Sequence, residues 1–154
     1  MRFEGKYKFL SNFYSVPISF EGIMYPSVEH AYQAAKTLNE QERLRIMRLG
    51  TAAQAKRAGR YLKGLRPNWD GIKLNIMLEL LRKKFFFKNM QRMLIATGDE
   101  ELIEENHWHD AFWGVCEGVG ENHLGKLLMQ VREEVKCALA GTAPSAAPYS
   151  EFTS

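Results

Sequence analysis

The sequence predicts a mostly helical single domain that contains one small β-hairpin. Apolar residues recur at helical spacing in several segments between residues 27 and 139, whereas the residues before them alternate between apolar and polar. The chain has 154 residues and is 45% hydrophobic. A chain of this size can bury roughly two-thirds of its unfolded surface in one core. We therefore expect one domain over residues 1–140 and a disordered tail of low complexity over residues 141–154.

The first segment, residues 2–25, is expected to be extended and to form the hairpin. Apolar residues alternate there with small or polar residues, and Glu21-Gly22 supplies a turn. Within this segment, Asn12 and Phe13 lie in a loop, where an amide and a ring could hydrogen-bond to and stack on a flat heterocycle. A hydrophobic loop anchored in the core is the alternative.

The segment 27–36 is predicted to be a helix with two distinct faces. Ser27 is a helix-start residue, and one face is apolar, comprising Val28, Ala31, Tyr32 and Ala35. The opposite face carries Glu29, Gln33 and Lys36 at helical spacing, so that an acid, an amide and an amine share one stripe. Such a stripe could line a cleft. The alternative is a solvated face, on which each side-chain pair stabilises the helix by only ~0.2–0.5 kcal/mol.

Further helices are expected after this one. Asn39 and Thr51 are plausible N-caps, and the helix that follows Thr51 has a small-residue face suited to close packing. The expected helices cover residues 39–49, the segment from Thr51 to before Gly64, and residues 70–87, 89–96, 99–105 and 122–139, with Leu139 on the buried side of the last. Residues 106–122, rich in His, Trp, Gly and acid, are expected to be a loop or a strand flanked by loops, where functional residues often lie.

Charge is distributed unevenly along the chain. Between Arg43 and Arg92 there are fourteen Lys or Arg and two acids, whereas residues 99–134 contain ten acids and two bases. The basic stretch could bind phosphates, for example through Arg57, Arg60 and Lys63, or it could be an ordinary solvated face. Aromatic residues that would stack on exposed bases are sparse in it, which does not favour sequence-specific binding of nucleic acid.

Cysteine content and hydropathy indicate a protein of the cytoplasm. Cys116 and Cys137 have neither the spacing of metal ligands nor that of a disulfide framework, so both are expected to be free thiols. No signal-peptide pattern begins the sequence, and no run of 18 apolar residues occurs, so no membrane association is expected.

Four ordered motifs resemble those of the NADAR superfamily, also called the YbiA-like proteins. The motifs are Phe9–Tyr14, Tyr25–Lys36, Asp110–Gly114 and Gly120–Arg132, and the resemblance extends from about Phe3 to Lys136. Trp69-Asp70 and Lys84-Phe85 also fall where the family pattern has them. The resemblance implies an α+β fold that binds a ribosyl-phosphate or ADP-ribose-containing substrate. It also implies an N-glycosidase that needs no metal or other cofactor.

Two substrate classes follow from the resemblance. Some relatives resemble enzymes that hydrolyse aminopyrimidine ribosyl phosphates of the riboflavin pathway, and others resemble enzymes that remove ADP-ribose from guanine in DNA. Both reactions break a C1′–N bond. The connection between Trp113-Gly114 and Gly120 is short in this chain, which leaves the choice between a metabolite and ADP-ribosylated DNA open.

The chemistry requires a carboxylate beside an oxocarbenium-like ribose, and the resemblance places the candidate residues. Glu29 is the expected catalytic carboxylate, with Asp110 as a possible second one. Lys36 could protonate the leaving nitrogen, bind phosphate or form a Schiff base with an opened sugar. Substrate binding is expected from Asn12, Phe13, Trp69, Trp113, Gly114, Gly120, Asn122 and Gly125, through stacking, side-chain amides and backbone amides.

Three other classes of protein remain open from the sequence. One is a metal-dependent hydrolase that would use His107, His109, Asp110 and His123. Another is a module that binds ADP-ribose or a nucleotide without turnover. The third is an interaction protein that works through its basic face and loses its partner as salt rises.

Overall fold

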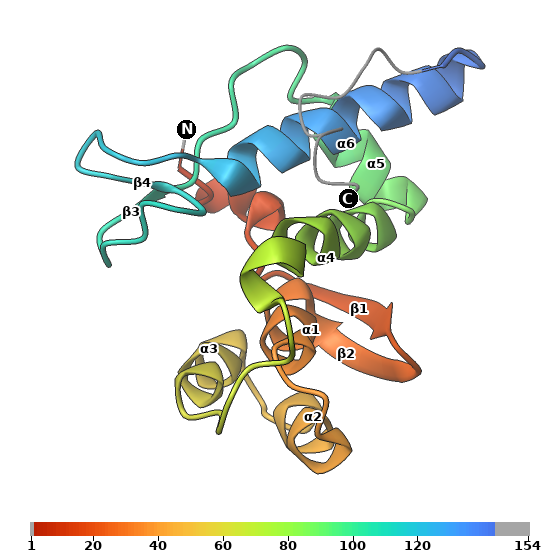
Figure 1. Cartoon of the computed structure of the whole chain (residues 1–154). Coiled ribbons are helices and arrows are strands. Elements are labelled where there is room, and N and C mark those ends of the chain that lie inside the picture. The colour runs from red at the N-terminus through yellow and green to blue at the C-terminus, as the bar shows by residue number, and fades with distance from the viewer. Residues whose placement is uncertain (1, 144–154) are drawn as a thin grey trace. The chain divides into compact units, whose positions relative to one another are not determined.

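Residues 2–143 are described by the computed structural model in Figure 1, and residues 144–154 of the predicted tail lie outside the described residues. The chain forms two compact units. We name Asn12–Lys84 the hairpin unit, and the part up to Ser11 and from Phe85 onward the terminal unit. Within residues 2–143, no helix combines the length and the apolar character that crossing a membrane requires.

The predicted hairpin opens the hairpin unit. Strands β1 (Ser15–Phe20) and β2 (Ile23–Ser27) pair in antiparallel fashion. Glu21 and Gly22 join them with φ values of 43° and 87°, as the two central residues of a type I′ turn require. The register of the pair shifts around Pro17, which has no N–H to donate to the ladder.

Helix α1 (Val28–Ala35) lies at the centre of the hairpin unit. It contacts both strands and the three other helices of the unit, α2 (Glu40–Met47), α3 (Ala52–Arg60) and α4 (Trp69–Lys84). Figure 1 shows α1 between the hairpin and α3. Every residue of α1 is buried, so this helix is central in the packing of the unit.

The predicted starts of α1, α2 and α3 are confirmed. The side-chain oxygens of Ser27, Asn39 and Thr51 each accept a hydrogen bond from the backbone N–H three residues later. At α3, Gln54 also returns its side chain to the backbone N–H of Thr51, which completes a capping box. The small-residue face of α3 is buried as expected, at Ala52, Ala55, Ala58 and Gly59.

The terminal unit contains the other elements. A 3₁₀ helix, η1 (Gly5–Leu10), precedes helices α5 (Lys88–Ile95) and α6 (His123–Ala140). Between these two helices, the short strands β3 (Glu105–Asn106) and β4 (Val115–Cys116) form a parallel pair. Cys116 and Cys137 are free thiols, as predicted.

Two expected boundaries were wrong. Residues 5–10 form η1 instead of an extended segment, with Gly5 in the left-handed region (φ 55°) and Tyr7 N–H donating to the Glu4 carbonyl. The helix expected over 70–87 ends at Lys84, because the chain turns there and Phe87 is the N-cap of α5.

The helix expected over 99–105 does not form. The side chain of Asn122 donates to the carbonyl of Leu102 (2.9 Å) and accepts from the N–H of Glu104 (3.0 Å), which holds the segment in a non-helical conformation. Leu102 is fully buried in this conformation. Tertiary hydrogen bonds and burial therefore override the local helical pattern.

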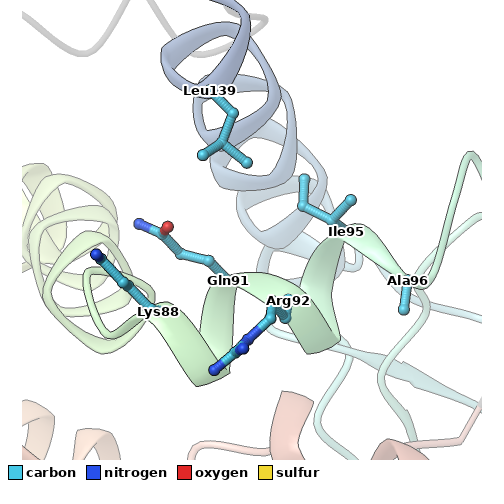
Figure 2. Close-up of a pocket in the computed structure, with 6 residues that line it drawn as sticks. All are labelled: Lys88, Gln91, Arg92, Ile95, Ala96 and Leu139. Atoms are coloured by element: carbon cyan, nitrogen blue, oxygen red, sulfur yellow. The ribbon is translucent and has the colours of Figure 1, made fainter.

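Leu139 is exposed, contrary to expectation, and it lies beside a cavity between α5 and α6. The cavity measures about 530 Å³ and is lined by Lys88, Gln91, Arg92, Ile95, Ala96 and Leu139. Figure 2 shows Leu139 on α6 pointing toward α5, with Ile95 extending from the opposite side. None of the residues that line this cavity belongs to the predicted site.

Candidate active site

The polar stripe of α1 is not a solvated face. Glu29 is 7% exposed and Gln33 is 5% exposed, whereas Lys36, one position beyond the helix, is half-buried. A carboxylate and an amide are rarely buried unless they are hydrogen-bonded or used. The structure therefore excludes the surface alternative for Glu29 and Gln33.

The start of α1 is fixed by Ser27 and His30. The Ser27 Oγ accepts a hydrogen bond from the His30 backbone N–H (3.1 Å) and lies 2.7 Å from His30 Nδ1. His30 Nε2 is 3.0 Å from the carbonyl of Leu49, which can only accept, so Nε2 donates and Nδ1 accepts from Ser27. Burial lowers the pKa of His30, although the bond to Leu49 acts in the opposite direction. A neutral His30 thus ties α1 to the connection between α2 and α3.

Glu29 is held from two sides. Its backbone N–H donates to the carbonyl of Asn12 (3.1 Å), and its Oε1 accepts from Gln33 Nε2 (2.8 Å). Asn12 is itself buried, and its Nδ2 lies 3.6 Å from Met77 Sδ. Among the described residues, Asn12 Oδ1 is buried without a hydrogen-bond partner.

Lys36 lies among charges of both signs. Burial makes the largest contribution to its pKa and lowers it, the carboxylate of Glu29 raises it, and three further cations lower it. The cations are Lys73 on α4, and Lys56 and Arg60 on α3. We name Lys36, Lys56, Arg60 and Lys73 the cation cluster. The charges of Glu29 and of these three cations all act on Lys36.

One aromatic ring lies beside Lys36, and a second ring packs against the first. Its Nζ is 5.4 Å from the centroid of the Tyr32 ring, and this ring is 5.4 Å from that of Trp69 at an interplanar angle of 50°. Trp69 is buried as the first residue of α4. The hairpin unit therefore brings together Glu29, Lys36 and Trp69, all predicted from the sequence.

Phe13 is not anchored in the core. Its side chain is 44% exposed, and the Nζ of Lys56 lies 6.0 Å from its ring. Phe13 also lines a cavity of about 330 Å³, together with His30 and Thr51. An exposed ring at the edge of a cavity can stack on a planar ligand.

The other predicted residues lie in the terminal unit, where Asp110 organises a loop. Asp110 Oδ1 accepts hydrogen bonds from the backbone N–H groups of Phe112 (3.1 Å) and Trp113 (2.9 Å). Asn106 clamps the same residue, donating to its carbonyl (2.8 Å) and accepting from its N–H (3.1 Å). These bonds give Asp110 a structural role, whatever its part in catalysis.

The residues around the start of α6 are also committed to local structure. The N–H groups of four consecutive residues donate to carbonyls of the Asp110 loop: Glu121 to Ala111, Asn122 to Gly114, His123 to Phe112, and Leu124 to Trp113. Backbone amides of this stretch were expected to bind the substrate, including one of its phosphates. In this loop conformation they are not available to one.

Three predicted glycines permit close backbone packing. A Cβ at Gly114 would overlap the carbonyl of Glu104, and one at Gly120 would overlap the carbonyl of Gly114. A Cβ at Gly125 would overlap the carbonyl of Leu102. The predicted residue Trp113 is half-buried, and its ring packs edge-on against the Phe112 ring, with 4.9 Å between the two ring centroids.

The side chains of the alternative metal site do not converge. His123 Nε2 faces the carboxylate of Glu121 (3.2 Å), and His109 Nδ1 lies 4.0 Å from Cys116 Sγ. Across residues 2–143, no group of three or more His, Cys, Asp or Glu side chains is placed to hold a metal ion. The geometry does not favour the metal-dependent alternative.

The basic stretch 43–92 is not one continuous surface. Arg43 is buried and donates to Glu21 (2.9 Å), and Lys84 is fully buried.

Lys56 and Lys73 of the cation cluster were missed as site residues. The spacing of Lys56 and Arg60 at i, i+4 signals a shared helix face, but the row chosen from the sequence was Arg57, Arg60 and Lys63.

Comparison with known proteins identifies several relatives. The chain is 40% identical over 128 residues to the N-glycosidase YbiA of Escherichia coli, a match that covers 81% of this chain and 79% of that protein. It is 39% identical over 142 residues to an N-glycosidase of Nostoc punctiforme, covering 88% and 90%. A riboflavin biosynthesis protein of Vibrio vulnificus is 42% identical over 131 residues, and the match spans 83% of this chain but only 35% of that longer protein.

A solved structure and a family model agree with these relatives. The NMR structure of E. coli YbiA matches with a TM-score of 0.81 and 36% identity, covering 93% of this chain and 88% of that one. The predicted mostly helical α+β fold is thereby confirmed. The model of the NADAR domain matches residues 2–136. With nearly the whole described chain matched, this protein belongs to the NADAR domain family.

Proposed function

We propose that this chain is an N-glycosidase that hydrolyses the bond between C1′ of a ribosyl phosphate and a nitrogen of an aminopyrimidine. The observation that carries the proposal is the buried carboxylate of Glu29, whose charge acts on Lys36 within the cation cluster. The names of the relatives support it, because two are N-glycosidases and a third is a riboflavin biosynthesis protein.

Glu29 acts on the sugar and on the attacking water. Its negative charge stabilises the positive charge that develops at C1′ as the C1′–N bond breaks. It also accepts a proton from the water whose oxygen bonds to C1′. The electron pair of the broken bond leaves with the nitrogen, so the products are ribose 5-phosphate and the free aminopyrimidine.

Lys36 donates the proton that the leaving nitrogen requires. Burial lowers the pKa of its ammonium, which makes it a stronger acid than an exposed lysine. Lys56, Arg60 and Lys73 then provide the positive charge for the phosphate, so Lys36 is not required for that task. This assignment selects proton donation among the three roles that the sequence left open.

The remaining contacts orient the substrate. The exposed ring of Phe13 stacks on the base, with Trp69 and Tyr32 forming the aromatic wall beside Lys36. The predicted contact of Asn12 with the substrate stays a prediction, because its Oδ1 is buried in this conformation. The contributions of the terminal unit stay predictions, and they concern Asp110, Trp113, Gly114, Gly120, Asn122 and Gly125.

ADP-ribosylated guanine in DNA is the second candidate substrate. It is favoured by the exposure of Phe13 and by the nearby charge of Lys56, which could accept an additional base and phosphate. The bond hydrolysed would be of the same kind, between a ribose C1′ and a nitrogen of the base, and the released product would be ADP-ribose.

Mass spectrometry of the products separates the alternatives. The protein is incubated with the aminopyrimidine ribosyl phosphate and, separately, with single-stranded DNA that carries ADP-ribosylated guanine. We expect ribose 5-phosphate from the first substrate. Release of ADP-ribose from the DNA alone would replace the first candidate by the second. Binding of both substrates without any product would contradict the proposal and indicate a binding module.

A further inference from the structure

We propose that Gln33 is a positioning residue that holds the Glu29 carboxylate in place, and that Gly59 of α3 is required because it leaves room for the Gln33 amide. The inference rests on the proposed function, since it assigns Glu29 to catalysis. It gives a role to Gln33, which the sequence placed on the polar stripe without one, and it adds Gly59.

The bond between Gln33 and Glu29 joins two buried side chains one turn apart on α1. Gln33 Nε2 lies 2.8 Å from Glu29 Oε1. A buried carboxylate depends on such a donor for its orientation and for the stability of its charge. The bond connects residues of the same helix, so it does not join α1 to another element.

The orientation of the Gln33 amide follows from the carboxylate. If the amide were reversed, its oxygen would face a carboxylate oxygen, and both groups are acceptors. Oε1 therefore points away from Glu29, and in the described part of the chain this buried oxygen has no hydrogen-bond partner. The protein leaves one buried acceptor unsatisfied while it supplies a donor to Glu29.

Gly59 makes this orientation possible. A Cβ added at position 59 would overlap Gln33 Oε1 and would lie 2.6 Å from Gln33 Cδ. Gly59 is in the last turn of α3, and glycine inside a helix is less favourable than alanine. The contact with Gln33 accounts for the glycine, because any side chain there would displace the amide that donates to Glu29.

The test is a set of kinetic measurements on variants that keep their fold. Gln33→Met preserves length and removes the donor, and we expect kcat to fall about 10- to 100-fold with KM nearly unchanged, as for loss of a hydrogen bond to a charged group. Gln130→Met is the matched control. Gln130 is also buried and donates to a carboxylate one turn away, Glu134 (3.2 Å), but it is on α6 and is not among the proposed site residues. We expect its kcat to equal that of the wild type.

A double-mutant cycle tests the role of Gly59. We expect Gly59→Ala to lower kcat as Gln33→Ala does, and the double variant to be no slower than Gln33→Ala alone, because the alanine at 59 then has no amide to displace. Thermal unfolding confirms that each variant is folded. If the decrease in kcat of the double variant equalled the product of the two single decreases, the two residues would act independently, and the inference would be overturned.

The outcomes distinguish this inference from the proposed function. If Glu29→Gln loses activity while Gln33→Met keeps the wild-type kcat, only the positioning role is overturned. If Glu29→Gln keeps the wild-type kcat, the catalytic assignment fails, and the positioning role fails with it.

Discussion

At the scale of the residue, burial distinguishes the site from an ordinary helix face. The sequence placed Glu29 and Lys36 on one stripe, but a stripe of this kind is equally common on solvated helices. The exposure of Glu29, only 7%, decides between the two interpretations. Lys56 and Lys73 could not be assigned from sequence, because their approach to Lys36 depends on how α3 and α4 pack against α1.

A pH profile tests the acid role of Lys36. Because burial lowers its pKa below the ordinary 10.5, the protonated acid is lost as pH rises through that lowered value. We expect the alkaline limb of kcat to lie below pH 10.5, and Lys36→Arg to move this limb upward while lowering kcat, since arginine stays protonated and donates poorly. An alkaline limb that is identical in Lys36→Arg would contradict the assignment.

At the scale of the element, the starts of three helices could be predicted from their capping residues. Ser27, Asn39 and Thr51 start α1, α2 and α3 as predicted, because a side-chain oxygen at an N-cap acts locally. The helix predicted over residues 99–105 does not form, because the interactions that decide its conformation are not local. There Asn122, distant in sequence, supplies the hydrogen bonds that keep the segment non-helical.

The cap of α3 provides a test of stability at this scale. Thr51→Ala removes the oxygen that accepts from Gln54 N–H (3.1 Å) and breaks the capping box. We expect the free energy of unfolding to fall by about 0.5–2 kcal/mol, measured by urea denaturation. Thr51→Ser keeps the hydroxyl and serves as the control, with a smaller loss expected. Equal stability of Thr51→Ala and the wild type would show that α3 does not depend on its cap.

At the scale of the whole molecule, the basic residues between Arg43 and Arg92 have several different structural roles. Two members of the basic stretch are buried, three belong to the cation cluster together with Lys36, and others remain exposed. Arg43 and Arg66 both pair with Glu21 at the hairpin turn, at 2.9 Å and 3.0 Å. Sequence counts could identify the excess of positive charge but not divide it among these roles. The expected location in the cytoplasm stays a prediction.

Lys84 links the stability of the protein to pH. It is fully buried, its Nζ lies 5.8 Å from the Tyr14 ring, and burial lowers the pKa of Lys84 to about 7. Between this value and the ordinary 10.5, the unfolded chain binds more protons at this residue than the folded chain does. The contribution of Lys84 to the free energy of unfolding therefore increases as pH rises through that window.

Lys84→Met tests this linkage. We expect the variant to lose the part of the rise in unfolding free energy between pH 7 and pH 9 that Lys84 contributes, because methionine does not titrate. Urea denaturation at the two pH values measures the difference. A variant with the same pH dependence as the wild type would show that Lys84 keeps an ordinary pKa in the folded protein.

The central claim is that the buried carboxylate of Glu29 drives hydrolysis of a ribosyl C1′–N bond. The most direct measurement compares the turnover of wild type and Glu29→Gln on the aminopyrimidine ribosyl phosphate, with thermal unfolding of both proteins. We predict a loss of kcat of roughly 10²- to 10⁴-fold in a variant that remains folded. A folded Glu29→Gln variant that releases ribose 5-phosphate at the wild-type rate would contradict the claim.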